Sequence, residues 1–206
     1  MTIRGVIERV TRQGDIFPVS ITPKEAIALH DWVVREHPVQ VIEVGLAWAF
    51  STLHICEALR EIGNADARLT AIDPNQATAF ENRGLQVLDE AGVGALVELV
   101  AEPSQIALPE LRAAGRTFDF AFVDANHRFD GVFVDLVNLA ALLESGSAVF
   151  IDDYQLPSIR RAVSFFTTNR GWTVEEQNDT ETDHHWIVLR TATEPDTRPF
   201  DHFVDF

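Results

Sequence analysis

Apolar and polar positions alternate along the chain in blocks that predict strands and helices in turn. Short β-branched runs, such as residues 39–44 and 118–124, have the length and composition of buried strands. Between the runs, apolar residues recur at three- and four-residue steps, most clearly over residues 129–143. Strands separated by helices predict a mostly parallel sheet covered on both faces, which is a doubly wound α/β fold.

Local signals set the expected boundaries. Thr22, Pro23 and Glu25 form a capping box with proline at the first helical position, so a helix should run from Pro23 to about Glu36. Ser51 is the expected cap of the next helix. The other helices are expected at residues 75–91, from Ser104, at 129–143 and at 157–169. The strands are expected at residues 39–44, 69–73, 96–100, 118–124 and 147–152, with a closing antiparallel pair at 172–177 and 185–190.

This alternation covers residues 22–190, so we expect one domain over residues 1–206 with two segments outside its core. Residues 1–21 and the tail, residues 191–206, are expected either to cover a site or to contact a partner subunit. The tail carries Phe200, His202, Phe203 and Phe206, and an aromatic tail outside the core is compatible with a homodimer.

Composition narrows the class of protein. A net charge of −16 without a run of basic residues argues against binding to nucleic acid or to an anionic membrane. No apolar run approaches the roughly 18 residues of a membrane helix, and charges interrupt the N-terminal segment, unlike a secretory signal. The one cysteine, Cys56, cannot form an internal disulfide. We therefore expect a cytoplasmic protein without a nucleic-acid or membrane partner.

Polar residues gather where the expected strands end. In an open α/β sheet, ligands bind beyond the carboxyl ends of the strands. The residues at those ends are Glu43 and Gly45, then Asp73, then Glu102, Ser104 and Gln105, then Asp124 and His127, and finally Asp152 and Asp153.

The stretch EVGLAWAFST, which includes Gly45, sits at the turn from the first strand into a helix. A pyrophosphate loop would need three glycines, whereas this loop has one, so a dinucleotide cofactor is not expected. A cofactor without phosphates needs one close backbone approach and an acid to hold two ribose hydroxyls. Asp73 is placed for the second role, although it can also be a turn residue before Pro74.

Asp124, Asp152 and Asp153 follow two strands that should be neighbours. Carboxylates brought together repel one another unless a cation lies among them, and oxygen ligands suit Mg²⁺, Ca²⁺ or Mn²⁺. Asp152 and Asp153 can instead cap the following helix. His127 can take a proton near neutral pH, or it can be an ordinary loop histidine. Asp183, His184 and His185 are interpreted as turn and strand, since successive strand residues point to opposite faces.

Four stretches, EVGLAWAFST, AIDPNQ, FVDANHRFDGVFVDL and VFIDDYQLPSIRRAVSFF, together resemble the class I S-adenosylmethionine-dependent methyltransferases. The nearest group is the metal-dependent O-methyltransferases of the catechol type and of the macrocin type, which act on sugars. The resemblance implies a seven-stranded Rossmann-like sheet with an antiparallel closing strand.

The same resemblance implies roles for individual residues. Glu43 and the loop from Gly45 to Ser51 would lie near the methionine part of the cofactor, and Asp73 would hold its ribose. Ser104 and Gln105, with Glu102 nearby, would line the adenine. Asp124, which borders the cofactor, would bind Mg²⁺ together with Asp152 and Asp153. His127 stands where the catechol-type enzymes have a lysine base, and Ala49 stands where the family has glycine.

These features predict an S-adenosylmethionine-dependent O-methyltransferase. Its Mg²⁺ would hold a small molecule with two neighbouring hydroxyls, of the phenol, sugar or other natural-product class. Two alternatives stay open: a metal-independent methyltransferase that uses His127 as the base, and a non-catalytic module that binds the cofactor. Loop residue Ala49 motivates the second alternative, since an alanine at positive φ would weaken cofactor binding.

Overall fold

The computed structural model describes residues 2–14, 19–178, 184–194, 196–199 and 201–206. They fall into two compact units, Met1–Ala107 and Leu108–Phe206, which we treat separately as the first and the second unit. The single domain expected from the sequence stays a prediction.

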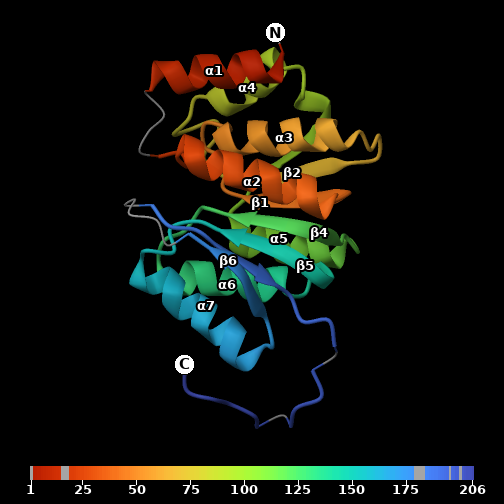
Figure 1. The fold of residues 1–206 in the computed structure, drawn as a ribbon, viewed down its shortest axis with the longest axis vertical. Helices are drawn as coiled ribbons and strands as arrows, with labels where there is room; N and C mark the ends of the chain where they lie inside the picture. The colour runs from red at the N-terminus through yellow and green to blue at the C-terminus, as the bar shows by residue number, and fades with distance from the viewer. Residues whose placement is uncertain (1, 15–18, 179–183, 195, 200) are drawn as a thin grey trace. The chain divides into compact units, whose positions relative to one another are not determined.

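The first unit is built on three parallel strands, β1 (Gln40–Val44), β2 (Arg68–Ile72) and β3 (Val97–Val100), in the order β3-β2-β1. Helices α2 (Pro23–Glu36) and α3 (Phe50–Ile62) pack against each other over this sheet (Figure 1). The predicted capping box of α2 is confirmed, because the Thr22 and Glu25 side chains each accept from the other residue's backbone N–H.

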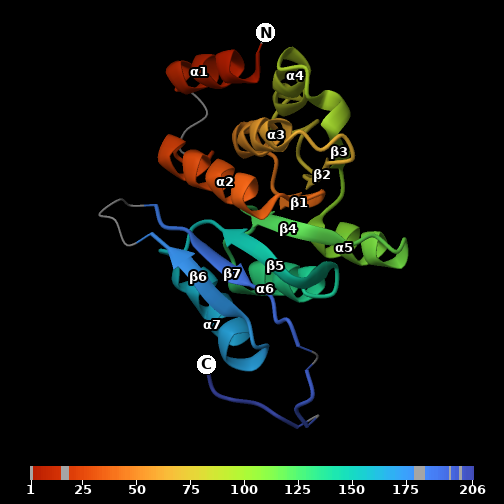
Figure 2. The ribbon, with the colours of Figure 1, turned by 45° about the vertical axis from the view of Figure 1, so that its right-hand side comes forward.

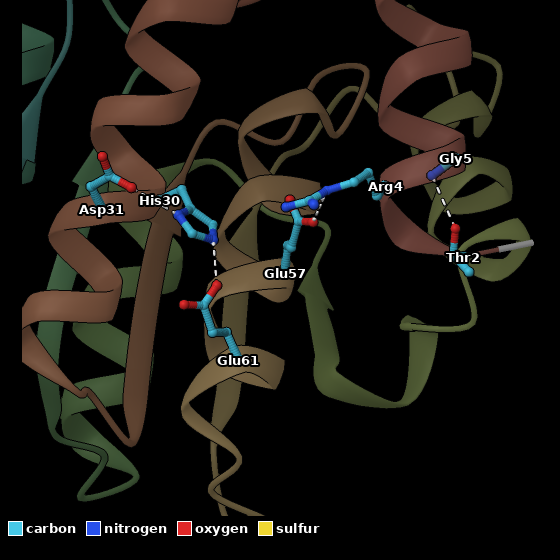
Figure 3. A network of polar contacts seen from close by, with 7 residues as sticks. All are labelled: Thr2, Arg4, Gly5, His30, Asp31, Glu57 and Glu61. Carbon is cyan, nitrogen blue, oxygen red and sulfur yellow. Dashed lines mark hydrogen bonds and ion pairs between the residues drawn. The ribbon is translucent and has the colours of Figure 1, made fainter.

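A helix that was not expected, α1 (Ile3–Gln13), precedes them. Its apolar side chains Ile3, Val6, Ile7 and Val10 are buried, and the Thr2 hydroxyl caps its first turn. Figure 3 shows that Arg4 reaches Glu57 of α3 at 3.2 Å, while His30 of α2 lies within 3.4 Å of Glu61. Residues 3–13 therefore belong to the packed part of the first unit.

The helix expected at residues 75–91 is shorter than predicted. Helix α4 spans Arg83–Glu90, and the 3₁₀ turn η1 (Gly94–Leu96) follows it. The Asp73 carboxylate accepts a hydrogen bond from the Asn75 N–H at 2.7 Å, an Asx turn directly after β2. Glu81 and Asn82 then have φ of 50° and 57°, which no α-helix tolerates.

The second unit has strands β4 (Phe118–Val123), β5 (Leu143–Ile151), β7 (Ile187–Arg190) and β6 (Thr173–Gln177), in that spatial order. β4 and β5 are parallel, whereas β7 runs antiparallel to both β5 and β6, as the predicted closing pair requires. Helices α6 (Phe129–Leu139) and α7 (Pro157–Asn169) lie side by side under this sheet (Figure 2). Helix α5 (Ser104–Ala113) crosses the boundary between the units.

Helix α6 ends at Leu139 and not at residue 143, so β5 begins four residues earlier than the predicted residue 147. The first residues of β5 form an irregular strand. Gly146 has a φ of 78°, and the pairing of β5 with β4 shifts register between Phe118 and Phe120. An irregular strand start has no alternating hydrophobic pattern from which to predict it.

The seven strands make a mostly parallel, Rossmann-like α/β fold with β7 antiparallel, which confirms the predicted fold class. Over the part of the chain that the structure describes, the helices are too short or too polar to cross a bilayer.

Candidate cofactor loop and acidic cluster

The loop after β1 bends through three residues with positive φ: Gly45 at 105°, Ala47 at 44° and Ala49 at 62°. Ala49 is the N-cap of α3 and is fully buried, so the predicted cap at Ser51 is wrong. An alanine in this conformation costs about 1 kcal/mol relative to glycine. Because alanine has no hydroxyl or carboxylate, the side chain of this N-cap residue makes no hydrogen bond to the first turn of α3.

Glu43, fully buried in β1, is tied to the start of α3. Its two carboxylate oxygens accept hydrogen bonds from the hydroxyls of Ser51 at 2.5 Å and Thr52 at 2.8 Å. The structure therefore brings the predicted pair Glu43 and Ser51 together. The two hydrogen bonds from Ser51 and Thr52 to Glu43 join β1 to the first turn of α3, and they fix the direction in which α3 leaves the loop.

Asp73 stands directly after β2 and is buried. One oxygen, Oδ2, accepts from the Ala47 N–H at 2.7 Å and from Gln76 Nε2 at 2.9 Å, while Oδ1 accepts from the Asn75 N–H at 2.7 Å. A carboxylate has about four acceptor positions, so three of them are engaged within the protein. Asp73 thus holds the loop as well as standing where a ribose acid is expected.

The residues predicted for the adenine follow β3. Glu102 and Gln105 are exposed, and Ser104 is the first residue of α5. The Asp73 N–H donates to the carbonyl of Val100 at 3.1 Å, so this loop leaves the sheet beside Asp73. The arrangement agrees with a shared ligand edge at the carboxyl ends of β2 and β3.

In the second unit, Asp124, His127 and Asp153 come together at the ends of β4 and β5, and their ligand atoms all lie within 4.8 Å of one another. His127 Nε2 is 2.7 Å from Asp153 Oδ2 and 3.6 Å from Asp124 Oδ1. We call these three residues the acidic cluster. Asp152, the third predicted metal ligand, is buried beside Asp153 but is not one of the three side chains that converge among the described residues.

The electrostatics of the acidic cluster centre on His127. The contacts with the Asp124 and Asp153 carboxylates outweigh partial burial and raise the pKa of His127 to about 10. Burial raises the pKa of Asp153, but hydrogen bonds from His127 and Gln155 to its carboxylate together have the larger effect. The pKa of Asp153 therefore lies below its usual range. His127 is therefore protonated at neutral pH in this arrangement, and it is the cation between the two carboxylates.

Backbone conformation and side-chain contacts fix this geometry. Asp153 has a φ of 56°, in the left-handed region that aspartate adopts more readily than most residues other than glycine. Gln155 Nε2 donates to Asp153 Oδ1 at 2.6 Å, and the Ser158 hydroxyl donates to the His127 carbonyl at 2.6 Å. Gln155 is not among the predicted site residues, although it lies two residues after Asp153 and its side chain can reach the Asp153 carboxylate.

The donor set fits one divalent cation. Two carboxylate oxygens and one imidazole nitrogen can surround an ion, provided that the imidazole gives up its proton. An imidazole ligand suits Mn²⁺ better than Mg²⁺, which prefers oxygen. His184 and His185 precede β7 outside the acidic cluster, while Asp183 lies outside the described residues.

The sequence and the fold match known proteins. A family model described as a methyltransferase domain matches residues 42–154, more than half of the chain. No curated protein matches the chain.

Among solved structures, the O-methyltransferase TomG from Streptomyces achromogenes, in complex with SAM, is 21% identical over 92% of this chain and 89% of its own, with a TM-score of 0.73. An O-methyltransferase from Bacillus cereus, in complex with SAH, is 14% identical over 92% of this chain and 90% of its own, with a TM-score of 0.75. At these identities the likeness shows the fold.

Proposed function

The chain belongs to the methyltransferase-domain family and is a methyltransferase, and from this premise we propose that it moves the methyl group of S-adenosylmethionine to a hydroxyl oxygen of a small molecule. We propose oxygen as the atom that accepts the methyl group because of the acidic cluster of Asp124, His127 and Asp153. Such a group can bind a hydroxyl, take its proton and hold a cation beside it.

Three features of the first unit support S-adenosylmethionine as the donor. The loop after β1 has one glycine and no pyrophosphate cradle, while Asp73 stands where a ribose would be held. Helix α3 begins at the end of this loop, and the partial positive charge of a helix N-terminus suits the carboxylate of a methionine moiety. The two similar structures described above hold SAM and SAH respectively.

The acidic cluster supports a divalent cation, Mn²⁺ or Mg²⁺, held by Asp124 and Asp153 with His127 as a third ligand or a neighbour. When bound, the cation would lower the pKa of a hydroxyl beside it. The protein side chains would position the acceptor oxygen and receive its proton. Oxygen then bonds to the methyl carbon as the carbon–sulfur bond breaks, and S-adenosylhomocysteine leaves with the bonding electrons.

A metal-independent reaction is the second candidate, and His127 favours it. Its imidazolium already offsets one of the two carboxylate charges, with Asp153 at 2.7 Å. As an imidazolium it cannot accept a proton, so it would first pass its proton to Asp124 or to solvent. In this version the acceptor needs one hydroxyl, whereas a metal-held acceptor would use two neighbouring hydroxyls.

Thermal melts separate these candidates. We expect S-adenosylmethionine to raise the Tm, and Mn²⁺ or Mg²⁺ to raise it further in the wild type but not in Asp124→Asn. No shift with S-adenosylmethionine would point to a protein that does not use this donor. A shift with S-adenosylmethionine and none with either metal, together with turnover unchanged by EDTA, would support the metal-independent reaction.

A non-catalytic module would also bind the cofactor. Release of S-adenosylhomocysteine during incubation with catechols or sugars distinguishes the enzyme from the module. Absence of release from every phenol and sugar tested, despite tight cofactor binding, would favour the module.

A further inference from the structure

The peptide of Ala47, in the middle of the cofactor loop, is held on both sides. Its N–H donates to Asp73 Oδ2 at 2.7 Å, and its carbonyl accepts from Gln76 Nε2 at 2.6 Å. Gln76 Nε2 also donates to the same Asp73 oxygen at 2.9 Å. Gln76, Asp73 and the Ala47 peptide therefore form a closed ring of three hydrogen bonds, which we call the loop clamp.

The loop needs such a clamp because its conformation is unfavourable without one. Ala47 and Ala49 both have positive φ, at 44° and 62°, in a region that alanine rarely occupies. Released from the clamp, the Ala47 peptide would rotate towards ordinary backbone angles. The loop would then lose the shape it presents between β1 and α3.

Gly84 supplies independent support for a tightly fixed loop. A Cβ added to Gly84 would lie 2.6 Å from Leu46 Cδ2, 2.7 Å from the Ala47 carbonyl oxygen and 2.9 Å from Gln76 Oε1. The backbone oxygen of Ala47 cannot move away without breaking its bond to Gln76. The first turn of α4 thus packs directly on the loop clamp, which leaves no room for a side chain at residue 84.

The chemistry of Gln76 suits positioning better than packing. Its side chain is buried, and its Oε1 has no hydrogen-bond partner among the described residues. A buried amide with an unpaired oxygen costs stability, so the contribution of Gln76 at this position lies in the two hydrogen bonds that its nitrogen donates. The single amide nitrogen of Gln76 has two N–H donors, one for Asp73 and one for Ala47.

We propose that Gln76 is a positioning residue of the cofactor site, acting through Asp73 and Ala47. It orients the Asp73 carboxylate, keeps Asp73 Oδ2 on the loop and leaves the remaining acceptor position of Oδ1 for a ribose hydroxyl. The inference rests on the proposed function, since the ligand in question is S-adenosylmethionine.

The test compares Gln76→Met with Gln86→Met, an identical change at an exposed position of α4. Calorimetric titration with S-adenosylmethionine should give a Kd about tenfold higher for Gln76→Met and an unchanged Kd for Gln86→Met. Gln76→Glu keeps the shape, removes both donors and places a like charge against Asp73, so it should weaken binding at least as much. A merely structural residue would lower the Tm and leave the Kd of the folded protein unaltered.

The result that would overturn the proposal is a Kd within about twofold of wild type in both folded Gln76 variants. Should neither variant fold, hydrogen exchange of the wild-type Gln76 side-chain amide, measured by NMR, decides, because that amide donates to both Ala47 and Asp73. Slow exchange would support the loop clamp, and exchange as fast as in an open loop would refute it. A wild type that binds no S-adenosylmethionine would refute the proposed function instead, while the exchange measurement would still test the clamp.

Discussion

Raising the pH in the absence of metal should destabilise the protein through His127. The imidazole lies 2.7 Å from Asp153 and 3.6 Å from Asp124, which raises its pKa from 6.5 to about 10. A proton bound more tightly in the folded state stabilises that state. This stabilisation is fully present below pH 6.5, declines as the pH rises above that value and is lost above about pH 10.

The size of the effect depends on exposure. The side chain of His127 is 52% exposed, so solvent screens its interaction with the two carboxylates. We therefore expect the free energy of unfolding to fall by about 1–2 kcal/mol, which is less than the shift in pKa would imply for a fully buried group. For a chain of this length that corresponds to a fall in Tm of roughly 2–8 °C.

The assay is thermal denaturation in EDTA between pH 6 and pH 11, on the wild type and on His127→Gln. Glutamine retains a hydrogen-bond donor but does not titrate in this range, so the difference in Tm between the two proteins should shrink as the pH rises. A difference that stays constant across the range would refute the charge assignment of His127. NMR titration of the imidazole would then give its pKa directly.

Three other substitutions have defined outcomes. Asp124→Ala should abolish most turnover but keep the Kd for S-adenosylmethionine, measured by calorimetry; undiminished turnover would remove Asp124 from the reaction. Asp73→Ala should raise that Kd about tenfold or more, through the loss of charge-assisted hydrogen bonds worth about 1.5–3 kcal/mol, and an unaltered Kd would contradict its role. Ala49→Gly should change the free energy of unfolding by less than about 1 kcal/mol, because relief of strain offsets the lost methyl group and the more flexible unfolded chain. Its Kd should be equal or lower, and a higher Kd would mean that the Ala49 methyl group is needed in the loop.

The strands could be predicted because their signals are local and repeated. Short apolar runs separated by helical patterns fix the fold class, and polar residues at the run ends identify the ligand edge. The same kind of signal also existed for α1, since Ile3, Val6, Ile7 and Val10 have helical spacing. Helical spacing alone does not tell whether this segment packs on the core, because it precedes the regular alternation.

Other features depend on contacts that a sequence does not display. The helix expected from residue 75 starts only at Arg83, because Glu81 and Asn82 have positive φ, which an α-helix cannot contain. Which of Asp152 and Asp153 joins the acidic cluster depends on the positive φ of Asp153, which its residue type does not predict.

The acidic cluster presents two ways of offsetting the charge of the same carboxylates, and they compete when His127 is itself a metal ligand. A proton on His127 offsets one of the two negative charges of Asp124 and Asp153 from within the protein, whereas a divalent cation would offset both from solution. Because a ligating imidazole must lose its proton, a pKa of about 10 reduces the apparent metal affinity at pH 7 by up to about a thousandfold. A metal would therefore need further ligands, and the two hydroxyls of a bound acceptor are chemically suited to provide them.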